Sequence, residues 1–126
     1  MAAFNIINVA TINDGIYTLV PAPGATAMGA APASGHVFEV GAIVAANTTG
    51  STAAATVTLY DGSNYRSIAT AISVPANATL IIVDKSYGLT LVDTSNQASG
   101  GAASQVFVTS GTSGALTFTM AFKDLS

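Results

Sequence analysis

The sequence predicts an all-β protein: a single β-sandwich or jelly-roll-like domain of about eight or nine short antiparallel strands. Apolar and polar residues alternate with a period of two along most of the chain, as in Thr56–Tyr60, where Val57 and Leu59 share one face. Turn-forming residues separate these runs, and no stretch carries a helically spaced apolar stripe with caps. A length of 126 residues suits one domain, residues 1–126, with a core that needs no metal or crosslink.

The alternating and β-branched runs are the expected strands. In chain order they cover about Phe4–Ala10, Ile16–Val20, His36–Ala46, Thr56–Tyr60, Tyr65–Val74, Thr79–Asp84, Leu89–Asp93, Gln105–Thr109 and Leu116–Phe122. The last run is the most regular, because Leu116, Phe118, Met120 and Phe122 all fall on one face. We therefore expect that face to lie in the core.

Turn residues separate these runs. The expected turns are Asn13-Asp14-Gly15, Asp61-Gly62-Ser63-Asn64, Pro75-Ala76-Asn77 and Ser110-Gly111-Thr112-Ser113-Gly114. Asp61-Gly62 lies between two alternating runs and is the strongest hairpin signal in the chain.

The segment Pro21–Gly35 breaks the alternation. It is too rich in Pro, Ala and Gly for a helix or a strand, and we expect a long loop of the kind that is often functional. Asn47–Ala55 and Ser95–Ser104 are expected to be similar connecting loops, with a weaker compositional signal.

Leu80-Ile81-Ile82-Val83 places four large aliphatic residues in succession, two on each face of a strand. The favoured interpretation is a central strand buried on both sides. The alternative is that one of its faces packs against another subunit.

Charge is scarce, and this excludes several functions. The chain has three basic and six acidic residues and a net charge of −3, so no Lys/Arg stripe exists to bind nucleic acid. The longest apolar run, Val37–Ala46, contains Glu39 and is too short to span a membrane. The start, Met1–Asn5, lacks the basic and apolar regions of a signal peptide, so we expect cytoplasmic synthesis without one. Because ordinary monomers carry more charge, its scarcity suggests that neighbouring molecules cover much of the surface.

No motif for catalysis or cofactor binding stands out, and we expect neither an enzyme nor a cofactor or metal site. His36 is the only histidine, and no G-x-S-x-G elbow, phosphate-binding glycine loop or calcium-loop register is present. The acids lie mostly beside turns or strand ends, as Asp14, Asp61 and Asp84 do, where Asp supports the backbone.

A sugar-binding site is an alternative at the 61–64 turn. Tyr60, Asp61, Asn64 and Tyr65 cluster there and could stack on and hydrogen-bond a saccharide. The chain has no Trp, however, and two Tyr at the base of a hairpin commonly just cover the strand ends. We favour this structural interpretation.

The order of several motifs resembles small virion proteins of tailed bacteriophages. Ile16–Ala22 (IYTLVPA) is similar to the opening of that group, and Val57–Ser63 (VTLYDGS) and Ile72–Leu80 (ISVPANATL) follow in the same order. Asp84-Lys85, Leu89–Leu91 and a closing strand to Ser126 complete the similarity. The inserted stretch Pro23–Ser34 departs from the shorter loop expected there.

The resemblance implies a structural protein on the outer surface of the virion, made in the host cytoplasm. Its expected role is capsid decoration: binding the major capsid protein and stabilising contacts between capsomers, as a homo-oligomer with a trimer favoured. The alternative is a neck, tail or fibre-associated module. On either view we expect no nucleic-acid or membrane partner.

Under this hypothesis two segments, Ala2–Ile7 and Pro21–Gly35, would contact the partner, although Ala2–Ile7 could equally be an ordinary first strand. Deletion of Ala25–Ala33 would then leave the domain folded and abolish particle binding. The expected contact residues are Ala2, Phe4, Ile6, Pro21, Pro23, Met28, Pro32, Leu80 and Ile82.

Overall fold

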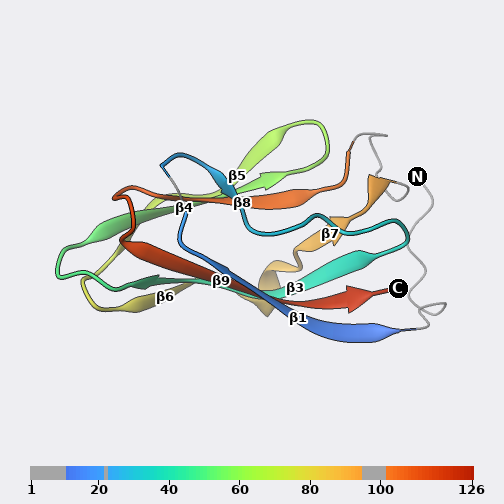
Figure 1. Cartoon of the computed structure of the whole chain (residues 1–126), viewed down its shortest axis with the longest axis horizontal. Helices are drawn as coiled ribbons and strands as arrows, with labels where there is room; N and C mark the ends of the chain where they lie inside the picture. Colours follow the sequence, from blue (N-terminus) through green and yellow to red (C-terminus); the bar gives the residue numbers. More distant parts are fainter. Residues whose placement is uncertain (1–10, 22, 95–101) are drawn as a thin grey trace.

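The computed structural model describes residues 11–21, 23–94 and 102–126 and confirms the all-β class. Two antiparallel sheets pack face to face, and in Figure 1 the strands of one lie above those of the other. The strands are β1 (Ile12–Leu19), β2 (Thr26–Ala27), β3 (Val37–Asn47), β4 (Ala53–Tyr60), β5 (Tyr65–Val74), β6 (Thr79–Val83), β7 (Thr90–Val92), β8 (Gln105–Ser110) and β9 (Leu116–Leu125). Among the described residues, no helix is long and apolar enough to cross a membrane.

The larger sheet has the strand order β1-β9-β3-β6, and β7 pairs with the first residues of β3. The smaller sheet has the order β2-β8-β4-β5. β3 and β9 form the centre of the larger sheet, paired from Val37 opposite Leu125 to Asn47 opposite Leu116. Segments distant in sequence therefore build its middle.

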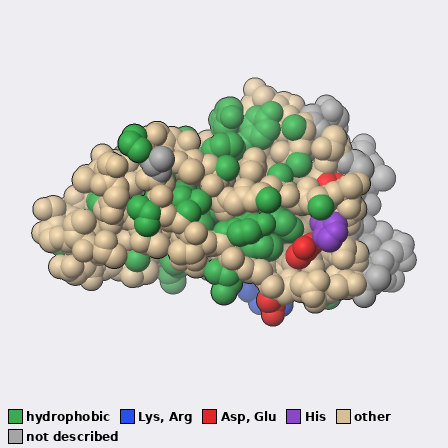
Figure 2. All heavy atoms as spheres, in the orientation of Figure 1, with side chains coloured by type: hydrophobic (Ala, Val, Ile, Leu, Met, Phe, Trp, Pro, Cys, Tyr) green, Lys and Arg blue, Asp and Glu red, His purple; other side chains and the backbone are tan. Residues whose placement is uncertain are grey.

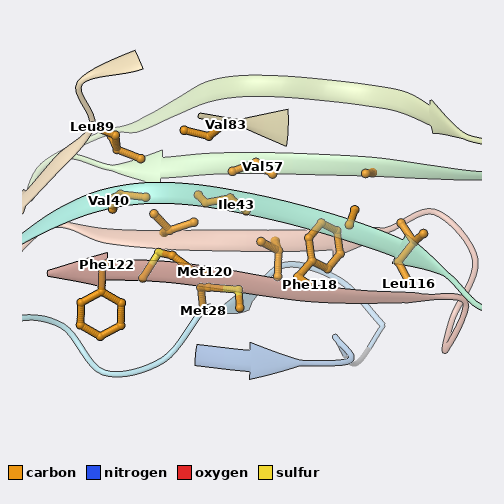
Figure 3. Close-up of a cluster of buried hydrophobic side chains, with 14 of the residues drawn as sticks. Met28, Val40, Ile43, Val57, Val83, Leu89, Leu116, Phe118, Met120 and Phe122 are labelled. Atoms are coloured by element: carbon orange, nitrogen blue, oxygen red, sulfur yellow. The ribbon is translucent and has the colours of Figure 1, made fainter. Parts of the chain in front are cut away.

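The core is formed by the inward faces of both sheets, as alternation predicts. Leu116, Phe118, Met120 and Phe122 of β9 are 0, 0, 1 and 8% exposed, whereas Ala121 between them is exposed. Figure 3 shows these four side chains spread along β9 in one cluster with Ile43 and Val57, which come from opposite sheets. The expected inward face of the last strand is confirmed.

The hairpin at Asp61-Gly62 is also confirmed. β4 and β5 pair with Tyr60 opposite Tyr65, and the Asp61 N–H donates to the Asn64 carbonyl over 3.0 Å. Gly62 has a φ of +98°, a backbone conformation that L side chains rarely adopt.

The expected turn at Asn13-Asp14-Gly15 is wrong, because all three residues lie inside β1. Gly15 lies opposite Phe122 on β9, and a Cβ at this glycine would be 2.4 Å from Cζ of that ring. The glycine lets an edge strand pass close to a core aromatic rather than reversing the chain.

The expectation that Pro21–Gly35 is wholly loop is wrong as well. Thr26–Ala27 forms β2 and pairs with β8, and the Met28 N–H donates to the Val106 carbonyl over 2.7 Å. The Met28 side chain is 1% exposed in the core (Figure 3). Deletion of Ala25–Ala33 would remove this core residue and a strand, so it is no clean test of partner binding.

Leu80–Val83 does not form a central strand. It lies in β6, which pairs only with β3 at an edge of the larger sheet. Val83 is buried, Leu80 and Ile82 pack half-buried against the core, and Ile81 is 63% exposed. A run of four aliphatic residues fits an edge strand here because its inward side chains meet the core and Ile81 faces outward.

Candidate functional site

The outer face of the larger sheet is built from residues that alternate with the core. Directly opposite residues share a face, so the register identifies its members. The members that are not buried include Ile12, Asp14, Ile16 and Thr18 of β1; Thr117, Thr119, Ala121 and Lys123 of β9; Glu39, Ala42, Val44 and Ala46 of β3; Thr79 and Ile81 of β6; and Thr90 of β7. Leu125, opposite Ile12, and Val37, opposite Leu125, also fall on this face by register, but they are only 3 and 2% exposed. The result is a surface of small, hydroxyl-bearing and aliphatic side chains. Its charged residues, Asp14, Lys123 and Glu39, lie opposite one another in one row across β1, β9 and β3.

That row lies beside a depression of about 360 Å³. It forms where β3 shifts register between Val40 and Ala42, at Gly41. The residues that line it are Asp14, Glu39, Val40, Gly41, Lys85, Gly88, Thr90, Ala121, Phe122 and Lys123. Both lysines of this charge-poor chain therefore line one depression.

Lys85 comes from the 3-10 turn Lys85–Tyr87, between β6 and β7. The Asp84 carboxylate caps this turn: it accepts from the Ser86 hydroxyl, and from the Ser86 N–H over 3.0 Å. These two bonds, the hydroxyl bond first, lower the pKa of Asp84. Gly88, at φ +66°, ends the turn in the left-handed conformation. The caps at Asp84 and Gly88 thus fix the position from which Lys85 lines the depression.

The two lysines differ in their partners. Lys123 Nζ donates to Asp14 Oδ1 over 2.9 Å, and this bond and the charge of Asp14, with a smaller effect of Glu39, raise the pKa of Lys123 above 10.5. Among the described residues, Lys85 has no ion-pair partner. The depression therefore offers one free ammonium group, which suits recognition of an acidic group on a partner.

The outer face of the smaller sheet is different in character. Thr56 and Thr58 alternate with the buried Val57, and Thr109 lies opposite Thr56. At the hairpin end, the rings of Tyr60 and Tyr65 lie 4.8 Å apart between centroids. This face combines a hydroxyl-rich strip with an aromatic end.

Phe107 of β8 joins this aromatic end, with its ring 5.5 Å from that of Tyr65. Sequence reasoning missed Phe107 because its position depends on pairing of β8 with β4, which brings Phe107 opposite Thr58. No local pattern around either segment indicates that pairing.

The predicted sugar-binding residues do come together, but their polar groups are largely engaged. The Asp61 carboxylate accepts from the Asn64 and Ser63 N–H groups over 2.7 and 3.0 Å, and from Arg66 Nε over 3.1 Å. These bonds, with that from Asn64 the strongest, lower the pKa of Asp61. The Tyr60 hydroxyl donates to the Gly62 carbonyl, which leaves the 64% exposed Tyr65 as the accessible ring.

His36 has a structural partner. Its Nδ1 lies 2.7 Å from Asp124 Oδ1, which joins the start of β3 to the end of β9. Figure 2 shows the histidine, in purple, beside an acidic side chain, with further acidic and basic side chains near the lower edge of the same face. Within the described residues, no hydroxyl bonds to the other ring nitrogen, so the pair lacks the nucleophile of a catalytic triad.

The structure also bears on metals. In residues 11–21, 23–94 and 102–126, no three His, Asp or Glu side chains gather closely enough to hold an ion. The part of the chain described here thus contains two surfaces suited to binding and no assembled metal centre.

The predicted partner contacts differ in how exposed they are. Pro21, Met28 and Pro32 are buried, whereas Pro23 is exposed. Contact of these residues with a partner stays a prediction. Leu80 and Ile82 are half-buried against the core. Ala2, Phe4 and Ile6, with the strand expected over Phe4–Ala10, lie outside the described residues.

The exposed aliphatic residues lie elsewhere than expected. Ile12, Ile16 and Val20, on or just after β1, are 60, 70 and 53% exposed, and Ile81 is 63% exposed. Ile12, Ile16 and Val20 fall on the same face in a period-two pattern, so the sequence held a signal for them. The turn expected at residues 13–15 hid this pattern, because it separated Ile12 from the strand.

Comparison with protein-family models, with curated proteins and with solved structures finds no match to this chain. The function of this chain is therefore inferred from its own residues and geometry.

Proposed function

We propose that this chain is a structural protein of a bacteriophage particle that decorates the capsid. It would bind the major capsid protein on the outer surface and stabilise contacts between capsomers, with no reaction to catalyse. The observation that supports this most is the outer face of the larger sheet. Its small and hydroxyl-bearing side chains lie between Ile16 on one edge strand and Ile81 on the other, and its charges are confined to one row.

Such a face suits attachment for a physical reason. Burying charges in an interface costs free energy unless each is paired, whereas small neutral side chains lose little when they are covered. The depression at Lys85 adds one point of charge recognition, which would set the orientation on the partner. On a symmetric lattice, weak contacts of this kind multiply over many copies.

The motif order noted above supports the same proposal, since Val57–Ser63 and Ile72–Leu80 resemble small virion proteins. In the structure these segments form the β4–β5 hairpin and its continuation into β6. Synthesis in the host cytoplasm, location on the virion surface and homo-oligomerisation belong to the proposal.

The decisive measurement is the copy number of this chain in purified phage particles, relative to the major capsid protein. A ratio near that of the capsid protein, or a simple fraction such as a third, is expected for decoration. A few copies per particle would place the chain at the neck, tail or fibres. Absence from particles would refute the proposal.

The binding face can be mapped with matched variants. Ile81→Lys and Lys85→Glu change exposed side chains of the larger sheet and its depression, and each is expected to lower occupancy on stripped particles. Tyr65→Ala alters an equally exposed residue on the opposite face and is expected to bind normally. Normal binding of both charge variants would contradict attachment through the larger sheet.

A glycan-binding module of the neck, tail or fibres is the second candidate, favoured by the exposed Tyr65 ring beside Tyr60 and Phe107. Aromatic faces of this kind stack on sugar rings. This alternative predicts specific hits on a glycan array that Tyr65→Ala removes and Ile81→Lys leaves unchanged. An array without hits would reject it.

A further inference from the structure

The free edge of β1 differs from the other sheet edges of the described chain. β5 has two register shifts against β4, and its Ala71 has a φ of +49°. β2 spans only two residues, and β6 and β7, of five and three residues, share the far side of β3. β1 runs for eight residues without a shift, so it is a long, regular edge. Its one charged residue, Asp14, is paired with Lys123 on β9.

The backbone groups at this edge can be identified from one pair of hydrogen bonds. The Thr11 N–H donates to the Ser126 carbonyl, and the Ser126 N–H to the Thr11 carbonyl, both over 3.0 Å. In an antiparallel ladder, such hydrogen-bonded pairs alternate with pairs whose backbone groups point away. The register is unbroken to Leu19, so Ile12, Asp14, Ile16 and Thr18 direct their N–H and C=O groups away from β9.

The side chains of the same residues are exposed. Ile16 is 70% and Ile12 60% exposed, and Val20, just beyond the strand, is 53% exposed. Tyr17 and Leu19 point the other way and pack against the core. The free edge therefore presents unpaired backbone and an aliphatic residue at every fourth position.

We propose that β1 pairs antiparallel with β1 of a second copy of this chain, around a two-fold axis at Ile16. In this register Ile16 lies opposite Ile16 of the second copy, Ile12 opposite Val20, and Asp14 opposite Thr18. Directly opposite residues share a face, so the exposed aliphatic side chains meet in pairs and each Asp14 meets a hydroxyl. The outward N–H and C=O groups of the four edge residues all gain partners.

Registers with the axis closer to the start of β1 fit less well. An axis at Asp14 would place two carboxylates directly opposite each other, which is destabilising. An axis at Gly15 would place each Asp14 against an aliphatic Ile16. The self-complementarity of β1 about Ile16 is the reason to assign a second copy, rather than an unrelated strand, as the occupant.

The pairing has consequences for symmetry. Two identical strands in antiparallel pairing are related by a two-fold axis, so β1 generates a dimer and not the trimer expected from the resemblance. Each larger sheet would continue into that of the second copy. The inference depends only on the edge geometry and is independent of the proposed attachment to a capsid.

Sedimentation equilibrium of the full chain tests the dimer. Ile16→Lys places two ammonium groups opposite each other at the axis and is expected to raise the dimer dissociation constant by about tenfold or more. Ile81→Lys makes the same change at an isoleucine of similar exposure on β6 and is expected to leave the dimer intact. Circular dichroism checks that both variants fold.

Crosslinking tests the register even if a lysine variant fails to fold. The chain has no cysteine, so Ile16→Cys introduces a single thiol. Opposite hydrogen-bonded residues lie about 5.5 Å apart between Cα atoms, within reach of a disulfide, so oxidation should give a covalent dimer. Ile81→Cys should remain monomeric on a non-reducing gel.

Three results would overturn the inference. They are a wild-type chain that stays monomeric at high concentration, a dimer that Ile16→Lys does not weaken, and crosslinking through position 81 but not position 16. Monomeric wild-type protein with an edge that binds added host or phage proteins would point to a foreign strand instead.

Discussion

Two segments of this chain have nearly the same turn chemistry and opposite structures. Asn13-Asp14-Gly15 lies within β1, whereas Asp61-Gly62 reverses the chain between β4 and β5. In the hairpin, the Asp61 carboxylate accepts from backbone N–H groups two and three residues later. In β1, the Asp14 carboxylate instead accepts from Lys123 on the neighbouring strand.

The difference shows which interactions decide whether such a segment forms a turn or a strand. An Asp-Gly turn is stabilised by local hydrogen bonds, each worth about 0.5–1.5 kcal/mol net. Residues 13–15 pair along β9 and let the Phe122 ring approach Gly15, beside Tyr17 and Phe38 at centroid distances of 4.8 and 4.5 Å. Burial of one such ring contributes about 1.5–3 kcal/mol, and the strand pairing adds to it. Tertiary packing therefore outweighs the local preference.

The largest expected effect comes from the ring that holds β1 in place. Phe122→Ala should lower the free energy of unfolding by about 3–5 kcal/mol, because it leaves a cavity among Tyr17, Phe38 and Val40. Urea unfolding followed by circular dichroism measures this. Tyr65→Ala, which removes an exposed ring at the other segment, should cost far less; equal losses would contradict the comparison.

The next effect concerns the glycine beneath that ring. Gly15→Ala should destabilise by about 1–3 kcal/mol, since the new Cβ overlaps the Phe122 ring. In the Phe122→Ala background the same change should cost much less, which a double-mutant cycle reveals. Additive losses would mean that Gly15 is needed for its backbone conformation and not for space.

At the hairpin, the corresponding glycine acts through its backbone. Gly62→Ala should destabilise by about 1–2 kcal/mol because residue 62 has a positive φ. Gly50→Ala is the matched control, as a Cβ there meets nothing within 4 Å, and it should be nearly neutral. A neutral Gly62→Ala would show that this turn tolerates side chains.

The smallest effect is electrostatic. Hydrogen bonds in the fold lower the pKa of Asp61 below the ordinary aspartate value of 3.8, so the ionised carboxylate stabilises the folded state above that pH. This contribution is lost as the pH falls through the folded-state pKa. The stability difference between wild type and Asp61→Asn should therefore shrink from pH 6 to pH 2 in urea titrations; a constant difference would contradict it.

The sequence by itself determined the fold class, most strands and the β4–β5 hairpin. These features are local: alternation defines two faces, as at Phe118 and Met120, and Asp61-Gly62 stabilises its own turn. The sequence also identified two rings of the aromatic end, Tyr60 and Tyr65, because these residues are close along the chain.

Only the tertiary structure decided which strands became neighbours. Met28 lies in the core because β2 pairs with β8, and Phe107 reaches Tyr65 because β8 pairs with β4. Ile16 and Ile81 are exposed because β1 and β6 are edges of the larger sheet. Pairing partners and sheet edges depend on contacts between residues far apart in the chain, and period-two alternation is the same in a central strand and at an edge.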